Sequence, residues 1–178
     1  MNLKSFKVAV AAIAMVGMVF TGCTGEDGED GPAGNANVSS ATFTQLTADW
    51  KDPTGTSALR LDTLSVPAIS QAVVNTGSVQ VFQTFSQNTD SLVWNIMPHR
   101  YLAVNTAQTA VTNMNLLASY NVGQVYLNAY SDDRLLVTID DMFIKVVIIP
   151  SAAKVAGVDV TNYEELKAVY GIQEFDVR

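Results

Sequence analysis

The chain has 178 residues, of which 48% are hydrophobic and 15% are charged, and its formal net charge is -7. This composition fits one globular domain with an export segment and excludes a largely disordered protein. The few basic residues are scattered along an acidic chain, which argues against nucleic acid as a partner, because binding to phosphates needs clustered lysine and arginine. The single cysteine excludes an internal disulfide bond.

The first 22 residues have the pattern of an export signal. Lys4 and Lys7 give a positive start, and residues 8–20 form an apolar stretch. That stretch is shorter than the roughly 20 apolar residues that a membrane-spanning helix needs, and it lies within the range of about 7 to 15 that is typical of signal peptides. We therefore expect residues 1–22 to be a signal peptide.

The residues that follow the apolar stretch account for the lone cysteine. Phe20-Thr21-Gly22-Cys23 resembles the lipobox of bacterial lipoproteins, in which small residues precede an obligatory cysteine; Phe20 stands where leucine is usual. The resemblance implies cleavage between Gly22 and Cys23, a diacylglyceryl group on the Cys23 sulfur and acylation of the new amine. Such an anchor hardly dissociates from a membrane. The alternative is an ordinary signal peptide followed by a chance cysteine.

Residues after Cys23 bear on where the lipoprotein goes. Thr24 replaces the aspartate that retains some lipoproteins in the inner membrane, so the expected destination is the outer membrane. Glu26 and Asp27 resemble an export signal that carries lipoproteins of some gut Gram-negative bacteria to the cell surface. The alternative is an acidic, solvated tether on the periplasmic face. Removal of residues 1–22 takes away two lysines and no acidic residue, which leaves a formal charge of -9.

Residues 23–40 are predicted to be a flexible, glycine-rich tether. Glycine recurs at every third position from Gly22 to Gly34, as in collagen, but the repeat is too short to offset the entropy of ordering three strands. A spacer is therefore favoured over a trimerising stalk. Residues 31–38, Gly-Pro-Ala-Gly-Asn-Ala-Asn-Val, resemble a family of small collagen-like bacterial surface lipoproteins, mostly of unassigned function, in which such a stub leads into one β-rich domain.

Residues 41–178 are predicted to be mainly β: a single antiparallel β-sandwich or barrel-like domain with one short C-terminal helix. Short β-type runs are separated by turn residues. They cover residues 78–85, 91–97, 101–106, 123–130, 134–139 and 142–149. Strict alternation in 123–130 predicts one aliphatic core face and one amphipathic face. The turn at Ser131, Asp132 and Asp133 predicts a hairpin between 123–130 and 134–139. Residues 142–149, interrupted only by Lys145, are expected to form a central strand that is covered on both faces.

The C-terminal helix has recognisable ends. Thr161 and Glu164 have the spacing of a capping box, Tyr163, Leu166 and Tyr170 share one face, and Gly171 stands at the position of a C-cap glycine. We expect this helix to lie against the sheet. The order of this strand, loop and helix is also similar to the close of domains in the collagen-like lipoprotein family.

The sequence gives little support to catalysis, metal or cofactor binding. His99 is the only histidine, no Gly-x-Ser-x-Gly motif is present, and His99 is expected in a loop. Zinc lacks its usual nitrogen and sulfur ligands. The pairs Asp132-Asp133 and Asp140-Asp141 are expected to be turns, with calcium at one of these loops as the alternative.

Tyr126, Asn128 and Tyr130 give the best indication of a binding surface. They share one strand face, where exposed tyrosines can stack on sugars, and Trp50 and Trp94 are candidates to extend such a platform. Ordinary packing in the core or on the surface is favoured over a ligand platform, because tyrosine is a common strand residue that usually packs against its neighbours. The leading hypothesis is a noncatalytic lipoprotein with a structural or interaction role at the cell envelope. A glycan-binding module is the alternative, and a hydrolase is third, to be favoured by a pocket that holds His99 beside a carboxylate and a hydroxyl.

Overall fold

The computed structural model describes residues 37–55, 59–85, 92–105, 107–134 and 138–172. All of them belong to one compact unit, Gly34–Arg178, which is distinct from Met1–Ala33. The predicted signal peptide, Cys23 and most of the predicted tether lie outside the described residues. Among the residues described, no helix is long and apolar enough to cross a membrane.

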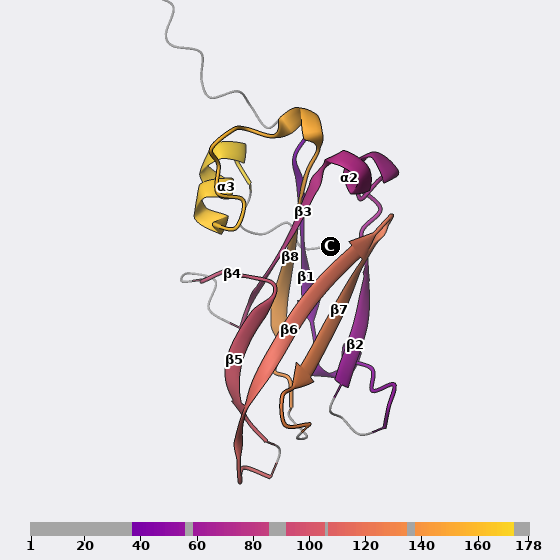
Figure 1. Cartoon of the computed structure of the whole chain (residues 1–178), viewed down its shortest axis with the longest axis vertical. Helices are drawn as coiled ribbons and strands as arrows, with labels where there is room; N and C mark the ends of the chain where they lie inside the picture. Colours follow the sequence, from indigo (N-terminus) through magenta and orange to yellow (C-terminus); the bar gives the residue numbers. More distant parts are fainter. Residues whose placement is uncertain (1–36, 56–58, 86–91, 106, 135–137, 173–178) are drawn as a thin grey trace, which may run out of the picture. The chain divides into compact units, whose positions relative to one another are not determined.

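Two four-stranded antiparallel sheets form a sandwich, not a closed barrel (Figure 1). Sheet A has the order β1 (Ser39–Gln45), β8 (Met142–Ile149), β3 (Ser78–Thr84) and β4 (Asn95–Ile96). Sheet B has the order β2 (Leu59–Ser65), β7 (Gln124–Ser131), β6 (Val111–Asn121) and β5 (His99–Val104). The predicted fold class is thereby confirmed. Its first strand begins at Ser39, two residues before the predicted start of the domain.

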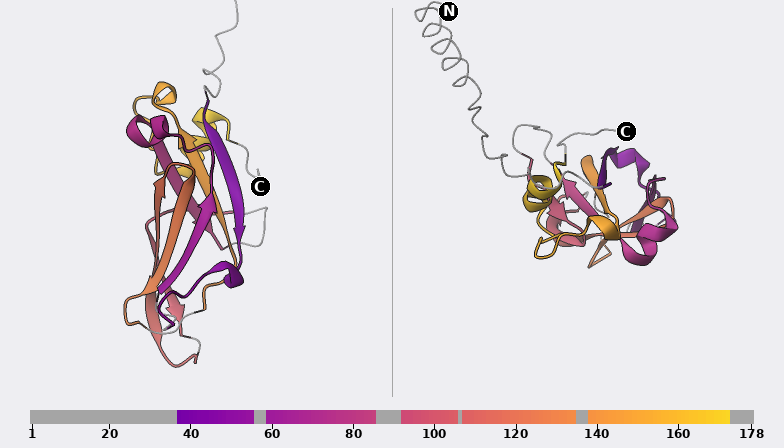
Figure 2. Two further views of the ribbon diagram at one scale, coloured as in Figure 1. Left: turned by 90° about the vertical axis from the view of Figure 1, so that its right-hand side faces the viewer. Right: turned by 90° about the horizontal axis from the view of Figure 1, so that it is seen from above.

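The helices are short. They are α2 (Gln71–Thr76), α3 (Tyr163–Tyr170) and the 3-10 turns η1 (Thr47–Asp49) and η3 (Ser151–Ala153). Seen from above in Figure 2, α2 and α3 lie apart on different sides of the strands. The sequence predicted α3 but not α2, whose N-cap is Ser70 and whose C-cap is Gly77, directly before β3.

The main core lies between the two sheets. Alternate residues of β7 supply it from sheet B, and alternate residues of β8 supply it from sheet A, because successive side chains of a strand point to opposite faces. Its members are chiefly branched aliphatic and methionine side chains, including Leu64, Val79, Val81, Met114, Leu116, Val125, Leu127, Ala129, Ile144, Val146 and Ile148. Full burial of each large aliphatic side chain contributes about 1.5–3 kcal/mol.

Strand β8 is buried on both faces, as predicted from its uniform hydrophobicity. Ile144, Val146 and Ile148 face the main core, whereas Val147 and Ile149 face a second cluster beneath α3. β1 and β3 pair with its two edges, so its backbone is hydrogen-bonded on both sides. Sheet A is therefore covered on its outer face by α3.

Lys145 is the one charged residue within β8, and its side chain is fully buried beneath α3. Its Nζ donates a hydrogen bond of 2.8 Å to the hydroxyl of Tyr163 and lies 4.9 Å from the ring centroids of Trp94 and Tyr163. A hydrogen bond and cation–π contacts offset part of the cost of removing the ammonium group from water. The lysine thus links the sheet to the helix.

Helix α3 begins one residue later than the predicted capping box requires. Its N-cap is Asn162, whose side-chain oxygen accepts hydrogen bonds from the backbone of Glu164 and Glu165. Thr161 bonds to Asp159 instead, so the predicted cap at Thr161 is wrong. Gly171 is the C-cap and has the left-handed φ of 63° that favours glycine, as predicted.

The predicted hairpin between 123–130 and 134–139 is wrong. Both edges of β7 are occupied by other strands, β2 on one side and β6 on the other. The hairpin partner of β7 is β6, which precedes it and which the sequence analysis missed. Asp132 and Asp133 do form a turn, and the described residues among 134–139 are not in a strand. The prediction paired β7 with the segment that follows it, but β2 and β6 occupy both edges of β7 and leave no edge for residues 134–139.

Candidate functional site

One face of the sandwich is the outer face of sheet B, here called the sheet B face. Val125, Leu127 and Ala129 of β7 are buried in the main core, so Tyr126, Asn128 and Tyr130 point the other way. Figure 1 draws β5, β6, β7 and β2 nearest the viewer with no helix in front of them. The predicted division of β7 into a core face and an amphipathic face is confirmed.

The strand register fixes the neighbours of the three predicted binding residues. Tyr126 lies between Thr63 of β2 and Ser119 of β6, and Tyr130 lies between Leu59 and Asn115. Asn128, between the tyrosines, is flanked by Leu61 and Leu117. At about 3.3 Å per residue, the two tyrosine positions are about 13 Å apart along β7. A ligand that contacts both rings must therefore be longer than one sugar unit.

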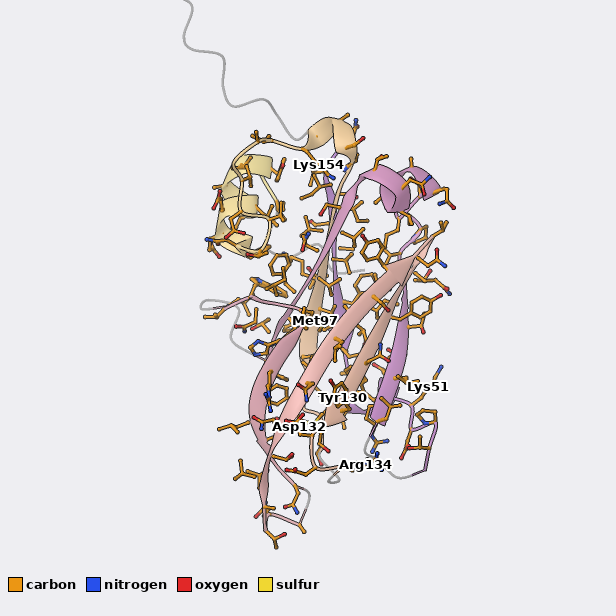
Figure 3. All side chains as sticks on the ribbon, viewed as in Figure 1. Lys51, Met97, Tyr130, Asp132, Arg134 and Lys154 are labelled. Atoms are coloured by element: carbon orange, nitrogen blue, oxygen red, sulfur yellow. The ribbon has the colours of Figure 1, made fainter. Side chains whose placement is uncertain are left out.

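The two tyrosines differ in exposure and bonding. Tyr130 has 39% of its surface exposed, whereas Tyr126 is half-buried and its hydroxyl donates a 2.7 Å hydrogen bond to Gln124. Asn115, beside Tyr130, donates to a carboxylate oxygen of Asp132 at 2.7 Å. Tyr130 and Asp132 are labelled in Figure 3 near the lower end of this row. Ring surface and amide groups are thus available together on this face.

The sheet B face is nearly uncharged although the chain is acidic. Within the four strands its outward side chains are leucine, valine, tyrosine, serine, threonine and amides, with Arg100 as the only charged residue. Arg100 forms an ion pair with Asp132, which follows β7. The charge of that pair is therefore neutralised locally, and the face suits a neutral ligand better than an ionic one.

Neither tryptophan extends the platform, in agreement with the favoured interpretation of ordinary packing. Trp50 packs in the main core with 6% of its surface exposed, and Trp94 packs beneath α3 with 9% exposed. Large aromatic side chains stabilise cores by the area they bury, and Trp50 and Trp94 contribute in this way to the two core clusters. Leu59, Leu61 and Leu117 lie on the sheet B face instead.

His99 lies in β5 and not in a loop, contrary to prediction. It stacks on Tyr101 with ring centroids 6.3 Å apart, and partial burial lowers the pKa of its imidazole. His99 and Tyr101 are two positions apart in β5, so both side chains point to its inward face. The described residues that line the neighbouring cavity do not include His99. His99 is therefore not part of this cavity, which holds Asp140 and the hydroxyl of Tyr101.

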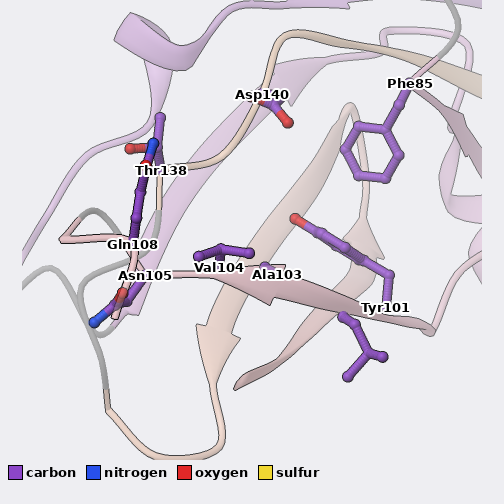
Figure 4. Close-up of a pocket in the computed structure, with 9 residues that line it drawn as sticks. Phe85, Tyr101, Ala103, Val104, Asn105, Gln108, Thr138 and Asp140 are labelled. Carbon is purple, nitrogen blue, oxygen red and sulfur yellow. The ribbon is translucent and has the colours of Figure 1, made fainter. Parts of the chain in front are cut away.

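A cavity of about 540 Å³ opens beside β5, and the sequence analysis did not foresee it. One wall is aromatic, where Phe85 and Tyr101 meet edge to face with centroids 4.9 Å apart. The carboxylate of Asp140 and the hydroxyl of Tyr101 point toward one another across the cavity (Figure 4). Burial, together with the nearby charge of Asp140, raises the pKa of Tyr101 to about 12. The phenol is thus a neutral donor at physiological pH.

The aspartate pairs are divided among different roles. Asp132 bonds to Arg100 and Asn115, and Asp133 accepts from the hydroxyl of Thr112. Asp141 accepts bonds from both the backbone and the hydroxyl of Thr47, which lower its pKa. No group of three or more histidine, cysteine, aspartate or glutamate side chains is arranged to hold a metal ion among the described residues.

Comparisons with models of protein families, with curated proteins and with solved structures found no match for this chain.

Proposed function

We propose that this chain is a noncatalytic lipoprotein, anchored by acyl chains on Cys23 to the outer membrane, with its β domain displayed on the cell surface in a structural or interaction role. The observation that carries the anchor is the order of a short apolar signal followed by Thr21-Gly22-Cys23. Two or three acyl chains make an effectively permanent attachment. The periplasmic face is the alternative side for the domain.

The anchor is tested by labelling cells with a palmitate analogue and comparing the native chain with Cys23→Ser. The native protein should carry label, begin at residue 23 by mass spectrometry and sediment with membranes. The variant should lack label and leave the membrane fraction. An unacylated native N-terminus, or a serine variant that still sediments with envelopes, would refute the anchor. Protease accessibility on intact cells then separates surface display from the periplasmic side.

A glycan-binding function is the second candidate, and the arrangement of the sheet B face supports it. The proposal rests on two tyrosines about 13 Å apart on one strand, with Asn128 between them and Asn115 beside Tyr130, on a nearly neutral face. Tyrosine rings can stack on the apolar side of a sugar, and amides can bond its hydroxyls. The spacing favours a neutral oligosaccharide over a monosaccharide.

Glycan-array binding by the native chain and by Tyr126→Ala and Tyr130→Ala tests this function. Each substitution should abolish the signal for a bound oligosaccharide. Tyr120→Ala is the matched control, because Tyr120 is 40% exposed but points to the other side of sheet B near the end of β6. Equal binding by all three variants would exclude Tyr126 and Tyr130 as the glycan-binding surface. The interaction role of the domain would then be assigned to a protein partner.

A further inference from the structure

The cavity beside β5 lies at the edge of sheet B, because β5 is the last strand of that sheet, whereas Tyr126 and Tyr130 lie two strands away on β7. Its lining combines Tyr101 and Ala103, which face inward from β5, with Leu102 and Val104, whose outward side chains are 72% and 53% exposed. A volume of about 540 Å³ is within the range of about 300–1,000 Å³ that is typical of small-molecule sites.

Charge is the feature that selects a ligand for this cavity. Asp140 is the only charged side chain among the described residues that line it. Thr138, Asn105 and Gln108 supply neutral polar groups, but Asn105 already holds the turn after β5 through bonds to Thr109 and Ala110. A carboxylate therefore faces the space without a cationic partner from the lining.

The aromatic wall adds to the same preference. Phe85 and Tyr101 both line the cavity, with their rings edge to face at an interplanar angle of 63°. Aromatic faces attract cations within about 6 Å of the ring centroid, most strongly where water is partly excluded. A carboxylate opposite two rings is complementary to a compact cation on an apolar stem, and the phenol oxygen of Tyr101 offers one further acceptor for an N–H group.

We propose that the cavity lined by Phe85, Tyr101 and Asp140 binds the ammonium group of a small organic amine. The amine nitrogen lies between the Asp140 carboxylate and the aromatic pair, and its apolar stem lies along Ala103. An amino sugar and a lysine side chain carry the same group. The cavity is thus a second recognition site, whose existence does not depend on the tyrosines of the sheet B face.

The test uses three probes of similar shape and different charge: n-butylammonium, n-butanol and butyrate. Two-dimensional NMR of the full-length chain in detergent should show saturable shifts at Phe85, Tyr101 and Ala103 with butylammonium only. Asp140→Asn should weaken that binding at least tenfold. Glu164→Gln, which removes one negative charge from the exposed surface of α3, should leave it unchanged. Butanol that binds as well as butylammonium, or equal affinities in the two variants, would overturn the proposal.

A second substitution separates the aromatic wall from the carboxylate. Phe85→Leu keeps the charge of the site and should weaken butylammonium severalfold, because the cation–π contribution is lost. Unchanged affinity in that variant would overturn the role of the rings. Glucosamine and Nα-acetyl-lysine amide then identify the natural source: the amine that binds more tightly indicates an amino sugar or a protein side chain, and failure of both amines to bind counts against the site.

Discussion

Replacement of Tyr163 by phenylalanine should reveal how far α3 depends on the buried lysine beneath it. The change deletes only the hydroxyl that accepts the 2.8 Å bond from Lys145, and the ring keeps its edge-to-face contact with Phe82 and its tilted contact with Trp94. A hydrogen bond to a charged group contributes about 1.5–3 kcal/mol net. We therefore expect the free energy of unfolding to fall by about 2 kcal/mol.

Urea unfolding followed by circular dichroism measures this loss. With an m-value of about 2 kcal/mol per molar urea, the midpoint should fall by roughly 1 M. Tyr126→Phe is the matched control, since it deletes a hydroxyl that bonds to Gln124 at an exposed position, and surface changes of this kind stay within about 0.5 kcal/mol. Equal effects of the two substitutions would refute the reasoning.

A double-mutant cycle isolates the pair. Lys145→Met keeps the length of an apolar stem, and replacement of a buried charge by a hydrophobic side chain of similar volume is often tolerated. In that background, Tyr163→Phe should cost less than about 0.5 kcal/mol, because the hydroxyl has lost its charged donor. A cost that stays near 2 kcal/mol would assign the effect to the helix itself and not to Lys145.

Three further predictions follow from the described contacts. The pKa of Tyr101, followed by NMR of its labelled ring, should be about 12. Asp140→Asn should lower this pKa but leave it above 10, because burial is the larger cause of the shift. Since the folded pKa is raised above the unfolded one, the stability that the neutral phenol contributes should be lost as the pH rises from about 10 to about 12. Asp141→Asn should lower the urea midpoint at pH 7, because the bonds from Thr47 depress the folded pKa of Asp141. The difference between the two proteins should begin to shrink as the pH falls below the ordinary carboxyl value near 3.8, and it should vanish below the lowered folded pKa. Gly171→Ala should lower stability by roughly 1 kcal/mol in urea unfolding, since nothing crowds the new Cβ but the left-handed backbone strains it.

Periodicity predicted the parts of the fold that a local pattern determines. The alternation in β7 indicates which side chains are buried, and the unbroken apolar run of β8 indicates a strand covered on both faces. The pairing of strands was harder to predict, because the residues of one strand do not determine which other strands lie at its two edges. The sequence therefore identified β7 correctly and paired it with the wrong segment.

The candidate sites show the same division. Tyr126, Asn128 and Tyr130 could be assigned to one face from their spacing alone, whereas the burial of Trp50 and Trp94 depends on elements far away in the chain. The cavity beside β5 was also beyond reach, because it joins Phe85 at the end of β3, Tyr101 in β5 and Asp140 before β8. A signal for part of it did exist, because the strand predicted at residues 101–106 places Tyr101 and Ala103 on one face, and its extension back to His99 was the part that was missed.

The two outer faces of the sandwich differ in a way that bears on function. Sheet A hides its outer face beneath α3, which buries Tyr163, Leu166 and Tyr170. Among the described residues, sheet B has no such cover: its outward Leu59, Leu61 and Leu117 are half-buried, whereas Leu102 is exposed. Tyrosines beside those leucines shield apolar surface from water even without a ligand, so their stability role and their binding role must be measured separately. A variant that keeps the unfolding midpoint but loses oligosaccharide binding distinguishes recognition from shielding.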